Sequence, residues 1–435
     1  MSMVVKNNMS AVSTLNTLNK NSAALSSSLK KVSSGMKINS AADDASGYAI
    51  SERMRVQIRG LDQANQNTQN GTSMMKVAEG AVSSTVDILK TLKEKVINAA
   101  NDTNTDADRA TIQKELDQSI DQINDNANVT YNGKYLVDGS HNSKVVATTT
   151  AMTNESLQST TTGTTLFCEM ADRNGNSLNI NSMDTITISF VKEGKTYSAT
   201  AAATQDLKTL LTNANSKAAN TFMTTIGTSS YIGKDIAGDT VHTADEKNAL
   251  TIEASGTGIK NQISGITISV TNTQGQVQKS ANAVLDNFSE SIRAQNTSAD
   301  NAISLQVGTK ANQSIKVGLT DMRAEALGLQ SSSGATLQIG TQEQANAAVN
   351  VLDNAVQKAL DQQTTIGSVQ SRLSYTSSNL TTASENVQAS ESTIRDADMA
   401  KEMTEYTKNN VLLQAAQSML AQANQSSSSV LSLLQ

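Results

Sequence analysis

Apolar residues recur every seven positions in both terminal parts of the chain, and this spacing predicts long helices that pack as coiled coils. Among the first forty residues, one row consists of Val4, Ala11, Leu18, Leu25 and Val32, and the row beside it of Leu15, Leu29 and Met36. Asn8 and Ser22 interrupt the second row. We therefore expect this helix to be poorly ordered in a free monomer and helical when it is packed.

Two longer helical rods are predicted on either side of a less regular middle region. The first rod extends from Ala49 to about Ala100, with rows of Met54, Leu61, Thr68, Met75, Val82, Leu89 and Val96, and of Ile50, Ala64, Gly71, Ala78 and Leu92. The second rod carries an unbroken row of Leu352, Ala359, Ile366, Leu373, Leu380, Val387 and Ile394. Small residues in the first rod let another helix approach closely, so we expect the two rods to pack together.

The last forty residues, Asp396 to Gln435, predict a further helix whose apolar residues recur mostly at three- and four-residue steps. A helix this apolar should not remain exposed to water, and nothing near it in the sequence is able to cover it. We expect the helix formed by the first forty residues to be its partner. The ends then pair with each other, the rods pair with each other, and the middle of the chain projects outward.

A polar segment, residues 33–54, separates the first helix from the first rod. Gly35, Gly47 and Asn39-Ser40 indicate a helix break, and Asp43 and Asp44 lie where acidic residues favour the start of the next helix. A metal or acid–base site built on these two carboxylates is the alternative. It is disfavoured because no His, Cys or third carboxylate accompanies the pair.

Turn signals mark the remaining short elements. After a break at 101–108, a second helix passes through Ile112, Leu116, Ile120 and Ile123. Asn132-Gly133, between two tyrosines, predicts a hairpin. A second hairpin, followed by a short turn, is predicted over residues 304–329.

The middle of the chain, residues 141–280, is rich in Thr, Ser, Asn and Gly and alternates in polarity. Two half-buried strands are predicted around residues 186–190 and 266–270, and a short helix around Leu207 to Leu211. The glycines of 256–265 are interpreted as a turn, because no phosphate-binding motif accompanies them. The predicted fold class is mainly α, with terminal coiled-coil helices forming a rod and an inserted α+β domain. Its predicted domains are residues 1–40, 41–140, 141–280, 281–395 and 396–435.

The composition agrees with long helices and excludes several classes of function. None of the 435 residues is proline, although about 5% is usual, and proline would kink a helical rod. A net charge of −6 without clustered Lys and Arg gives no reason to expect nucleic acid. No apolar run is long enough to insert into a membrane, and the start lacks the apolar core of a cleaved signal. The single cysteine, Cys168, is expected to be an idle thiol, and no cofactor or metal is expected.

Four stretches of the sequence resemble bacterial flagellins, and together they cover roughly 140 residues at each end. They are SSGMKINSAADDASGYAI at 33–50, GLDQANQNTQNGTSMMKVAEGA at 60–81, QVGTKANQSIKVGLTDMRAEALGL at 306–329, and SESTIRDADMAKEM at 390–403 with the residues that follow it to the end. The resemblance implies a structural, non-enzymatic subunit of an extracellular filament that supports motility. It also implies export without a cleaved signal peptide, by the flagellar export apparatus with an export chaperone, and contacts with filament cap and junction proteins.

The resemblance further implies that the protein's main partner is itself, because flagellins polymerise through paired terminal helices. Ordering a helix costs about 1 to 2 kcal/mol per residue, so burial between neighbouring subunits must offset that cost. Head-to-tail contacts that do not close produce a helical filament. We expect polymerisation to depend on Leu15, Leu18, Leu25, Leu29, Val32, Val411, Leu412, Leu413, Met419, Leu420, Val430, Leu431 and Leu434.

Flagellins also resemble one another in a rod patch that Toll-like receptor 5 binds, and this chain departs from that pattern. The candidate patch consists of Lys90, Thr91, Lys93, Glu94, Lys95 and Glu115. Thr91 replaces an arginine and Lys95 replaces a leucine, whereas Glu94 and Glu115 fit. We expect weakened recognition, because a hydroxyl does not replace a bidentate arginine and a charge does not replace an apolar contact. The alternative is that the lysines form a solvated helix face.

Three other functions remain as alternatives. A minor flagellar hook–filament junction protein shares terminal coiled coils with flagellins. An enzyme in the inserted domain would require a zinc motif, yet His141 and His242, the only histidines, lie about a hundred residues apart. A free coiled-coil adhesin or secretion-system tip protein would not account for the resemblance at both ends.

Overall fold

The computed structural model describes residues 8–218 and 225–433 of the chain. Its α-helices are α1 (Met9–Ser34), α2 (Ala45–Ala99), α3 (Asp106–Ala127), α4 (Leu207–Lys217), α5 (Lys279–Leu285), α6 (Gln342–Arg395) and α7 (Met399–Leu433). The fold class is confirmed as mainly α, with long terminal helices and an inserted strand-containing region between them. Among the described residues, no helix has the length and apolar character that a membrane crossing requires.

The strands of the described residues are short, and all of them lie between α3 and α6 in the sequence. They are β1 (Thr130–Tyr131), β2 (Lys134–Tyr135), β3 (Ala151–Asn154), β4 (Thr185–Lys192), β5 (Lys195–Ala202), β6 (Thr225–Ser229), β7 (Tyr231–Lys234), β8 (Thr240–His242), β9 (Ala249–Glu253), β10 (Ile263–Thr271), β11 (Ser289–Ile292), β12 (Ile303–Gln306) and β13 (Ser314–Val317). The β1–β2 hairpin turns at Asn132 and Gly133, whose φ angles are 50° and 75°, as that sequence predicts. The predicted second hairpin is confirmed as β12–β13.

The chain divides into two compact units. The first consists of Met1–Thr68, Gln306–Gln313 and Tyr375–Gln435. It therefore holds α1, α7, the beginning of α2 and the end of α6. The second consists of Gln69–Leu305 and Ser314–Ser374 and holds the rest of both rods, α3 and the inserted strands.

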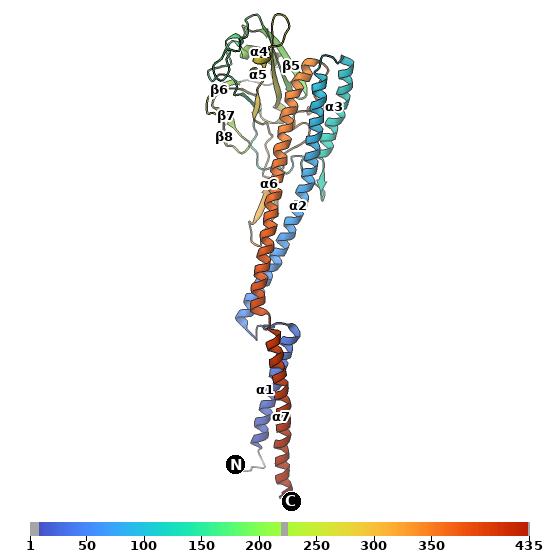
Figure 1. Ribbon diagram of the computed structural model, residues 1–435, viewed down its shortest axis with the longest axis vertical. Helices are drawn as coiled ribbons and strands as arrows, with labels where there is room; N and C mark the ends of the chain where they lie inside the picture. Colours follow the sequence, from blue (N-terminus) through green and yellow to red (C-terminus); the bar gives the residue numbers. More distant parts are fainter. Residues whose placement is uncertain (1–7, 219–224, 434–435) are drawn as a thin grey trace. The chain divides into compact units, whose positions relative to one another are not determined.

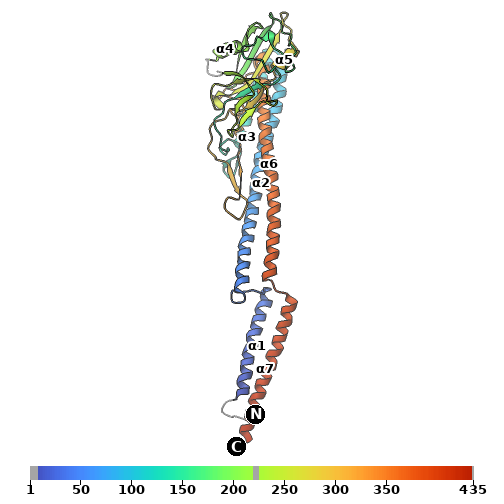
Figure 2. The same ribbon diagram turned by 90° about the vertical axis from the view of Figure 1, so that its left-hand side faces the viewer.

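In the first unit, α1 and α7 lie side by side and run in opposite directions (Figures 1 and 2). Early residues of α1 accordingly contact late residues of α7. The side chain of Asn21 donates to the carbonyl of Leu412 at 3.3 Å, and Ser28 accepts from Asn409 at 3.1 Å. The beginning of α2 packs on the end of α6 through a small apolar cluster of Leu61, Ala64 and Leu380. The predicted pairing of ends with ends is confirmed.

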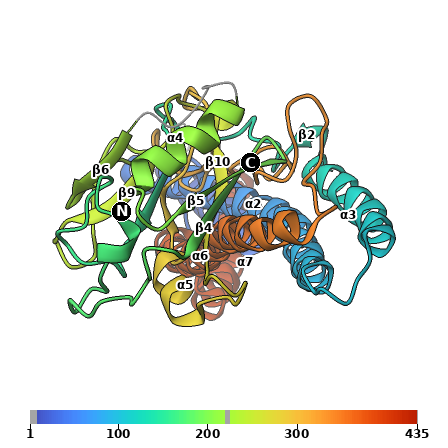
Figure 3. The same ribbon diagram turned by 90° about the horizontal axis from the view of Figure 1, so that it is seen from above.

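In the second unit, α3, α2 and α6 lie side by side, with α2 in the middle (Figures 1 and 3). The predicted heptad rows form their core, and Met75, Val82, Leu89 and Val96 of α2 are fully buried. The row on α6 is buried likewise through Leu352, Ala359, Ile366 and Leu373. Glu79 of α2 accepts a 2.7 Å hydrogen bond from Gln370 of α6. The seven-residue spacing therefore identified the buried face of both rods.

The inserted domain contains two antiparallel sheets, ordered β10-β4-β5 and β11-β3-β9-β6. Its core is built from Phe167, Phe190 and aliphatic residues of both sheets, with α4 and α5 packed against them. The predicted strands at 186–190 and 266–270 lie in β4 and β10, and the predicted helix is α4. Residues 256–265, expected as a turn, contain a 3₁₀ turn at Ile259–Asn261 and the first residues of β10.

Candidate functional site

The contact between α1 and α7 combines apolar and polar residues at coiled-coil spacing. The α1 residues that are buried or half-buried within α1 are Ala11, Thr14, Leu18, Asn21, Leu25, Ser28, Lys31 and Val32. On α7 the corresponding residues include Glu402, Asn409, Leu413, Ala416, Leu420 and Ala423. The predicted row Ala11, Leu18, Leu25 and Val32 therefore faces inward, but four polar residues lie beside it.

The prediction for the second row of α1 is wrong. Leu15 and Leu29 are 45% and 52% exposed, and Met36 lies in the bend after the helix. Thr14, Asn21 and Ser28, one position earlier, take the place next to α7, where Asn21 and Ser28 form hydrogen bonds with it. One residue corresponds to about 100° of helix rotation, so a neighbouring row points away from the partner. A single subunit leaves these leucines uncovered.

A matching set of apolar residues on α7 also points away from α1. Val411 and Met419 are 59% and 62% exposed, and Leu412, Met399 and Met403 are exposed as well. The predicted polymerisation residues thus fall into two groups. Leu18, Leu25, Val32, Leu413 and Leu420 are half-buried, whereas Leu15, Leu29, Val411, Leu412 and Met419 are exposed. Val430 and Leu431 belong to α7, but their side chains, and Leu434 as a whole, lie outside the described residues.

The first unit contains two bends, one between α1 and α2 and one between α6 and α7. Backbone hydrogen bonds join the two bends. Gly35 ends α1 with a left-handed φ of 68°, which glycine adopts without strain. Its carbonyl accepts from the Ala397 N–H at 2.9 Å, and the carbonyl of Arg395 accepts from the Lys37 N–H at 2.7 Å. These two hydrogen bonds therefore hold the break after α1 and the break between α6 and α7 next to each other.

Arg395 connects the bend after α6 to α2, and the sequence analysis did not predict this role. Its guanidinium is buried, donates to Ser51 Oγ at 3.0 Å and to Glu52 Oε1 at 2.7 Å, and lies over the ring of Tyr48. The hydrogen bond from Arg395 lowers the pKa of Glu52. Its position directly after the apolar row that ends at Ile394, at the predicted boundary between residues 395 and 396, is the signal that would have identified it.

Asp43 and Asp44 hold the polar segment after α1. Asp43 accepts from the backbone of Asn39 and Ser40, and the hydroxyl hydrogen bond from Ser40 is the largest cause of its lowered pKa. Asp44 accepts from the Ser46 and Gly47 N–H groups at 3.0 Å, so it caps the start of α2 as predicted. Gly47 itself, expected in the break, lies in the first turn of α2, because this cap starts the helix before it. Within the described residues, no three His, Cys, Asp or Glu side chains come together as a metal site.

The candidate receptor patch lies on α2 and α3 in the second unit, with its three lysines paired. Lys95 Nζ lies 3.0 Å from Glu115, Lys90 pairs with Asp87 at 3.3 Å, and Lys93 pairs with Asp353 of α6. Thr91 and Glu94 are exposed. Exposed ion pairs contribute little stability, so these residues are available for contacts with another molecule.

Comparison with known proteins gives concordant matches at both ends of the chain. Residues 5–142 match the family described as bacterial flagellin N-terminal helical region, and residues 349–434 match the bacterial flagellin C-terminal helical region. A flagellin from Clostridium tyrobutyricum is 34% identical over 97% of this chain and 99% of its own. A flagellin from Bacillus subtilis is 29% identical over 99% of this chain and 100% of its own.

A solved structure of a flagellar junction protein from Legionella pneumophila is also similar to this chain. It is 14% identical, covers 80% of this chain and 99% of its own, and superposes with a TM-score of 0.32. A score this low carries no argument about fold or function.

Proposed function

This chain belongs to the bacterial flagellin family, and we propose that it is the structural subunit of a flagellar filament that polymerises through its paired terminal helices and supports motility. The observation that supports this most directly is the outward apolar face of the α1–α7 pair. Leu15 and Leu29 on α1, and Val411, Leu412 and Met419 on α7, are exposed in the single subunit. We define these five residues as the outward face.

Burial of the outward face between subunits supplies the driving force for assembly. Fully burying a leucine, valine or methionine side chain contributes about 1.5 to 3 kcal/mol, and several such residues are available on each subunit. The contact inside the subunit is weaker than a uniformly apolar coiled coil, because Thr14, Asn21 and Ser28 occupy one of its rows. The helices of one subunit therefore gain most from contacts with neighbours, and a head-to-tail contact that does not close extends into a filament.

Seeded polymerisation followed by negative-stain electron microscopy tests this proposal. The full chain should extend short filament fragments, and a chain lacking Asn410 to Gln435 should not. A Leu15→Ser/Leu29→Ser variant should retain the helix content of the monomer yet fail to extend the seeds, because it alters only exposed positions. Val277→Ser, at a 52% exposed apolar position of the inserted domain, is the matched control and should polymerise normally.

Two outcomes would contradict the proposal. If the full chain stays monomeric in the presence of seeds, it is not the main subunit, and the role of a junction protein takes its place. If the serine variant extends seeds at the rate of the full chain, the outward face does not drive assembly.

The remaining partners follow from membership of the family. We propose export to the cell exterior by the flagellar export apparatus, with an export chaperone and without a cleaved signal peptide, and contacts with cap and junction proteins at the filament ends. Toll-like receptor 5 is a further proposed partner, with contacts weakened at Thr91 and Lys95. We assign no enzymatic activity to the chain.

A further inference from the structure

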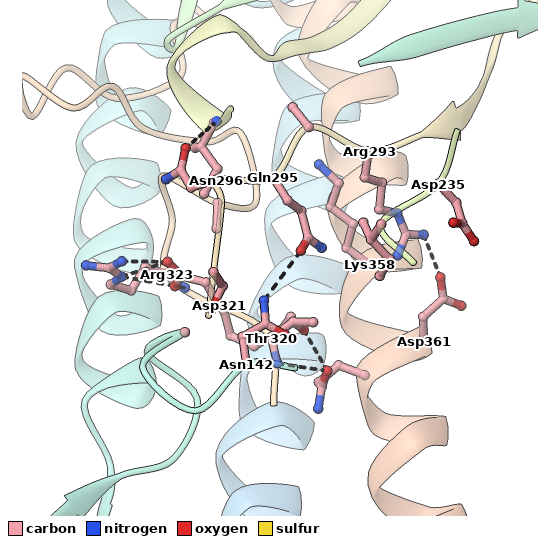
Figure 4. A pocket seen from close by; sticks show the side chains of 18 of the residues that line it. Asn142, Asp235, Arg293, Gln295, Asn296, Thr320, Asp321, Arg323, Lys358 and Asp361 are labelled. Atoms are coloured by element: carbon pink, nitrogen blue, oxygen red, sulfur yellow. Dashed lines mark hydrogen bonds and ion pairs between the residues drawn. The ribbon is translucent and has the colours of Figure 1, made fainter. Parts of the chain in front are cut away.

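The second unit contains a cavity of about 710 Å³ that polymerisation does not explain. It is bounded by the loop at 138–142, by β11 and the residues after it to 298, by the loop at 320–326, and by one face of α6. Figure 4 shows polar side chains from these segments, among them Asn142, Gln295, Thr320 and Lys358, around one space. Its volume lies within the range of about 300 to 1,000 Å³ that is usual for small-molecule sites.

Buried polar groups line the inner wall of this cavity. Gln362 is 4% exposed; its side-chain oxygen accepts from the N–H and hydroxyl of Thr320, while its Nε2 has no hydrogen-bond partner. The side chain of Glu290 is 4% exposed, and neither carboxylate oxygen has a hydrogen-bond partner. A buried donor without a partner, such as Gln362 Nε2, costs about 1 to 3 kcal/mol, so a ligand that accepts from it is favoured. The Glu290 carboxylate is ion-paired, and its oxygens still have lone pairs for a ligand donor.

The charges at this wall cancel. Lys358, whose side chain is 8% exposed, lies 3.3 Å from Glu290, and burial lowers the pKa of Lys358. Arg293 is 3.6 Å from the same carboxylate and 2.5 Å from Asp361 of α6, an ion pair drawn in Figure 4. At this buried wall two cations and two carboxylates pair with one another, so a neutral ligand needs no counter-charge there. The less buried part of the lining carries Asp138, Asp235, Asp321 and Arg323, so the cavity as a whole has an excess of two carboxylates, which disfavours an anion.

We propose that this cavity binds a neutral, hydroxyl-rich small molecule of the size of a mono- or disaccharide. Hydroxyl groups both donate and accept, so one such ligand satisfies the oxygens of Glu290 and the Nε2 of Gln362 together. Met322, Ile259 and Ile292 line the same space and offer apolar contacts to the C–H groups of a sugar ring. This binding is independent of the outward face, so its failure and the failure of the proposed polymerisation are distinguishable.

Saturation-transfer difference NMR on the monomeric full chain tests the proposal. The probes are glucose, galactose, N-acetylglucosamine, maltose and lactose, with glucuronate as the charged comparator. At least one neutral sugar should bind with a dissociation constant below about 10 mM, and glucuronate should bind more weakly.

Two variants locate the binding. Thr365→Trp places a large ring at the exposed edge of the cavity, and Thr364→Trp is its matched control, because the two hydroxyls make equivalent bonds within α6 but only Thr365 lines the cavity. Gln362→Glu keeps an acceptor for Thr320 and replaces the unpartnered donor with a carboxylate oxygen. Thr365→Trp and Gln362→Glu should each weaken binding by about tenfold, and Thr364→Trp should not.

Three results would overturn the proposal. The first is no transfer to any neutral sugar, and the second is equal transfer to glucuronate. The third is binding that Thr365→Trp and Gln362→Glu leave unchanged while both variants retain the circular dichroism and melting curve of the parent chain.

Discussion

Nη1 of Arg395 lies 2.7 Å from Oε1 of Glu52, so the last residue of α6 is fastened to the second turn of α2. The arginine side chain is 7% exposed, and its other contacts are Ser51 and the ring of Tyr48. The same residue offers its carbonyl to the bend after α1. One side chain and one peptide group therefore hold both helix breaks of the first unit in place.

Replacing this arginine should loosen the bends. Arg395→Leu leaves Glu52 without its strongest partner and buries no replacement donor for Ser51, so we expect a lower melting temperature of the first unit. Slower seeded polymerisation should accompany it. Arg55→Leu is the control, because Arg55 also pairs with Glu52, at 3.4 Å, but on the exposed surface of α2. Equal melting curves for the two variants would contradict the role given to Arg395.

The polar row inside the α1–α7 contact predicts a stabilising substitution. Asn21→Leu with Ser28→Leu makes that row apolar, and we expect the helical pair to gain about 1 to 3 kcal/mol, with more helix in the free monomer. Circular dichroism during thermal unfolding measures both effects. Asn19→Leu with Ser26→Leu introduces the same side chains at exposed positions, also seven residues apart, and should not stabilise the monomer. A similar gain in both variants would mean that the row does not face α7.

These rows also show how much of the fold the sequence predicts. The rods were predicted correctly because they carry the same apolar row for many turns, as Leu352 to Leu373 do, and a buried face is the only place for such a row. In α1, apolar residues lie on two neighbouring rows. Spacing alone does not reveal which row packs inside the subunit, so Leu15 and Leu29 were assigned to the wrong contact.

The cavity was not predictable for a different reason. Glu290, Thr320 and Lys358 lie in three separate segments, and only the folded chain brings them together. Each is also an ordinary polar residue in its own segment, without a motif around it. Arg395 is an intermediate case, because its position at a helix break is visible in the sequence, while its partners on α2 are not.

A buried carboxyl group makes the stability of the second unit depend on pH. Burial raises the pKa of Asp286 from its usual 3.8 to about 6, although its carboxylate accepts hydrogen bonds from the Ile268 N–H and from Asn350 of α6. The protonated form is the one favoured in the fold, so its stabilising contribution is complete below about pH 4 and is lost as the pH rises through 6. A shift of about two units corresponds to about 3 kcal/mol at most.

We therefore expect Asp286→Asn to remove this pH dependence and to stabilise the second unit at neutral pH, since asparagine still accepts from Ile268 and Asn350. Thermal unfolding between pH 4 and 7.5 measures the difference between the variant and the parent chain. Asp239→Asn, at an exposed turn, controls for the loss of a carboxylate. The prediction fails if the difference between Asp286→Asn and the parent chain is the same at both ends of that pH range.

Two substitutions in the candidate receptor patch should strengthen recognition by Toll-like receptor 5. Lys95 is paired with Glu115 at 3.0 Å, and Thr91 is exposed beside it with its hydroxyl bonded to the carbonyl of Asp87 in its own helix. Thr91→Arg with Lys95→Leu places a bidentate donor and an apolar contact at these positions, and it releases Glu115 to bind another partner. We expect the concentration that half-activates cells carrying Toll-like receptor 5 to fall by about tenfold or more. Lys76→Leu removes an exposed lysine of the same helix outside the candidate patch, and it should leave the response unchanged. If the double variant is no more active than the parent chain, Thr91 and Lys95 do not limit recognition, and the lysines of this segment are a solvated helix face.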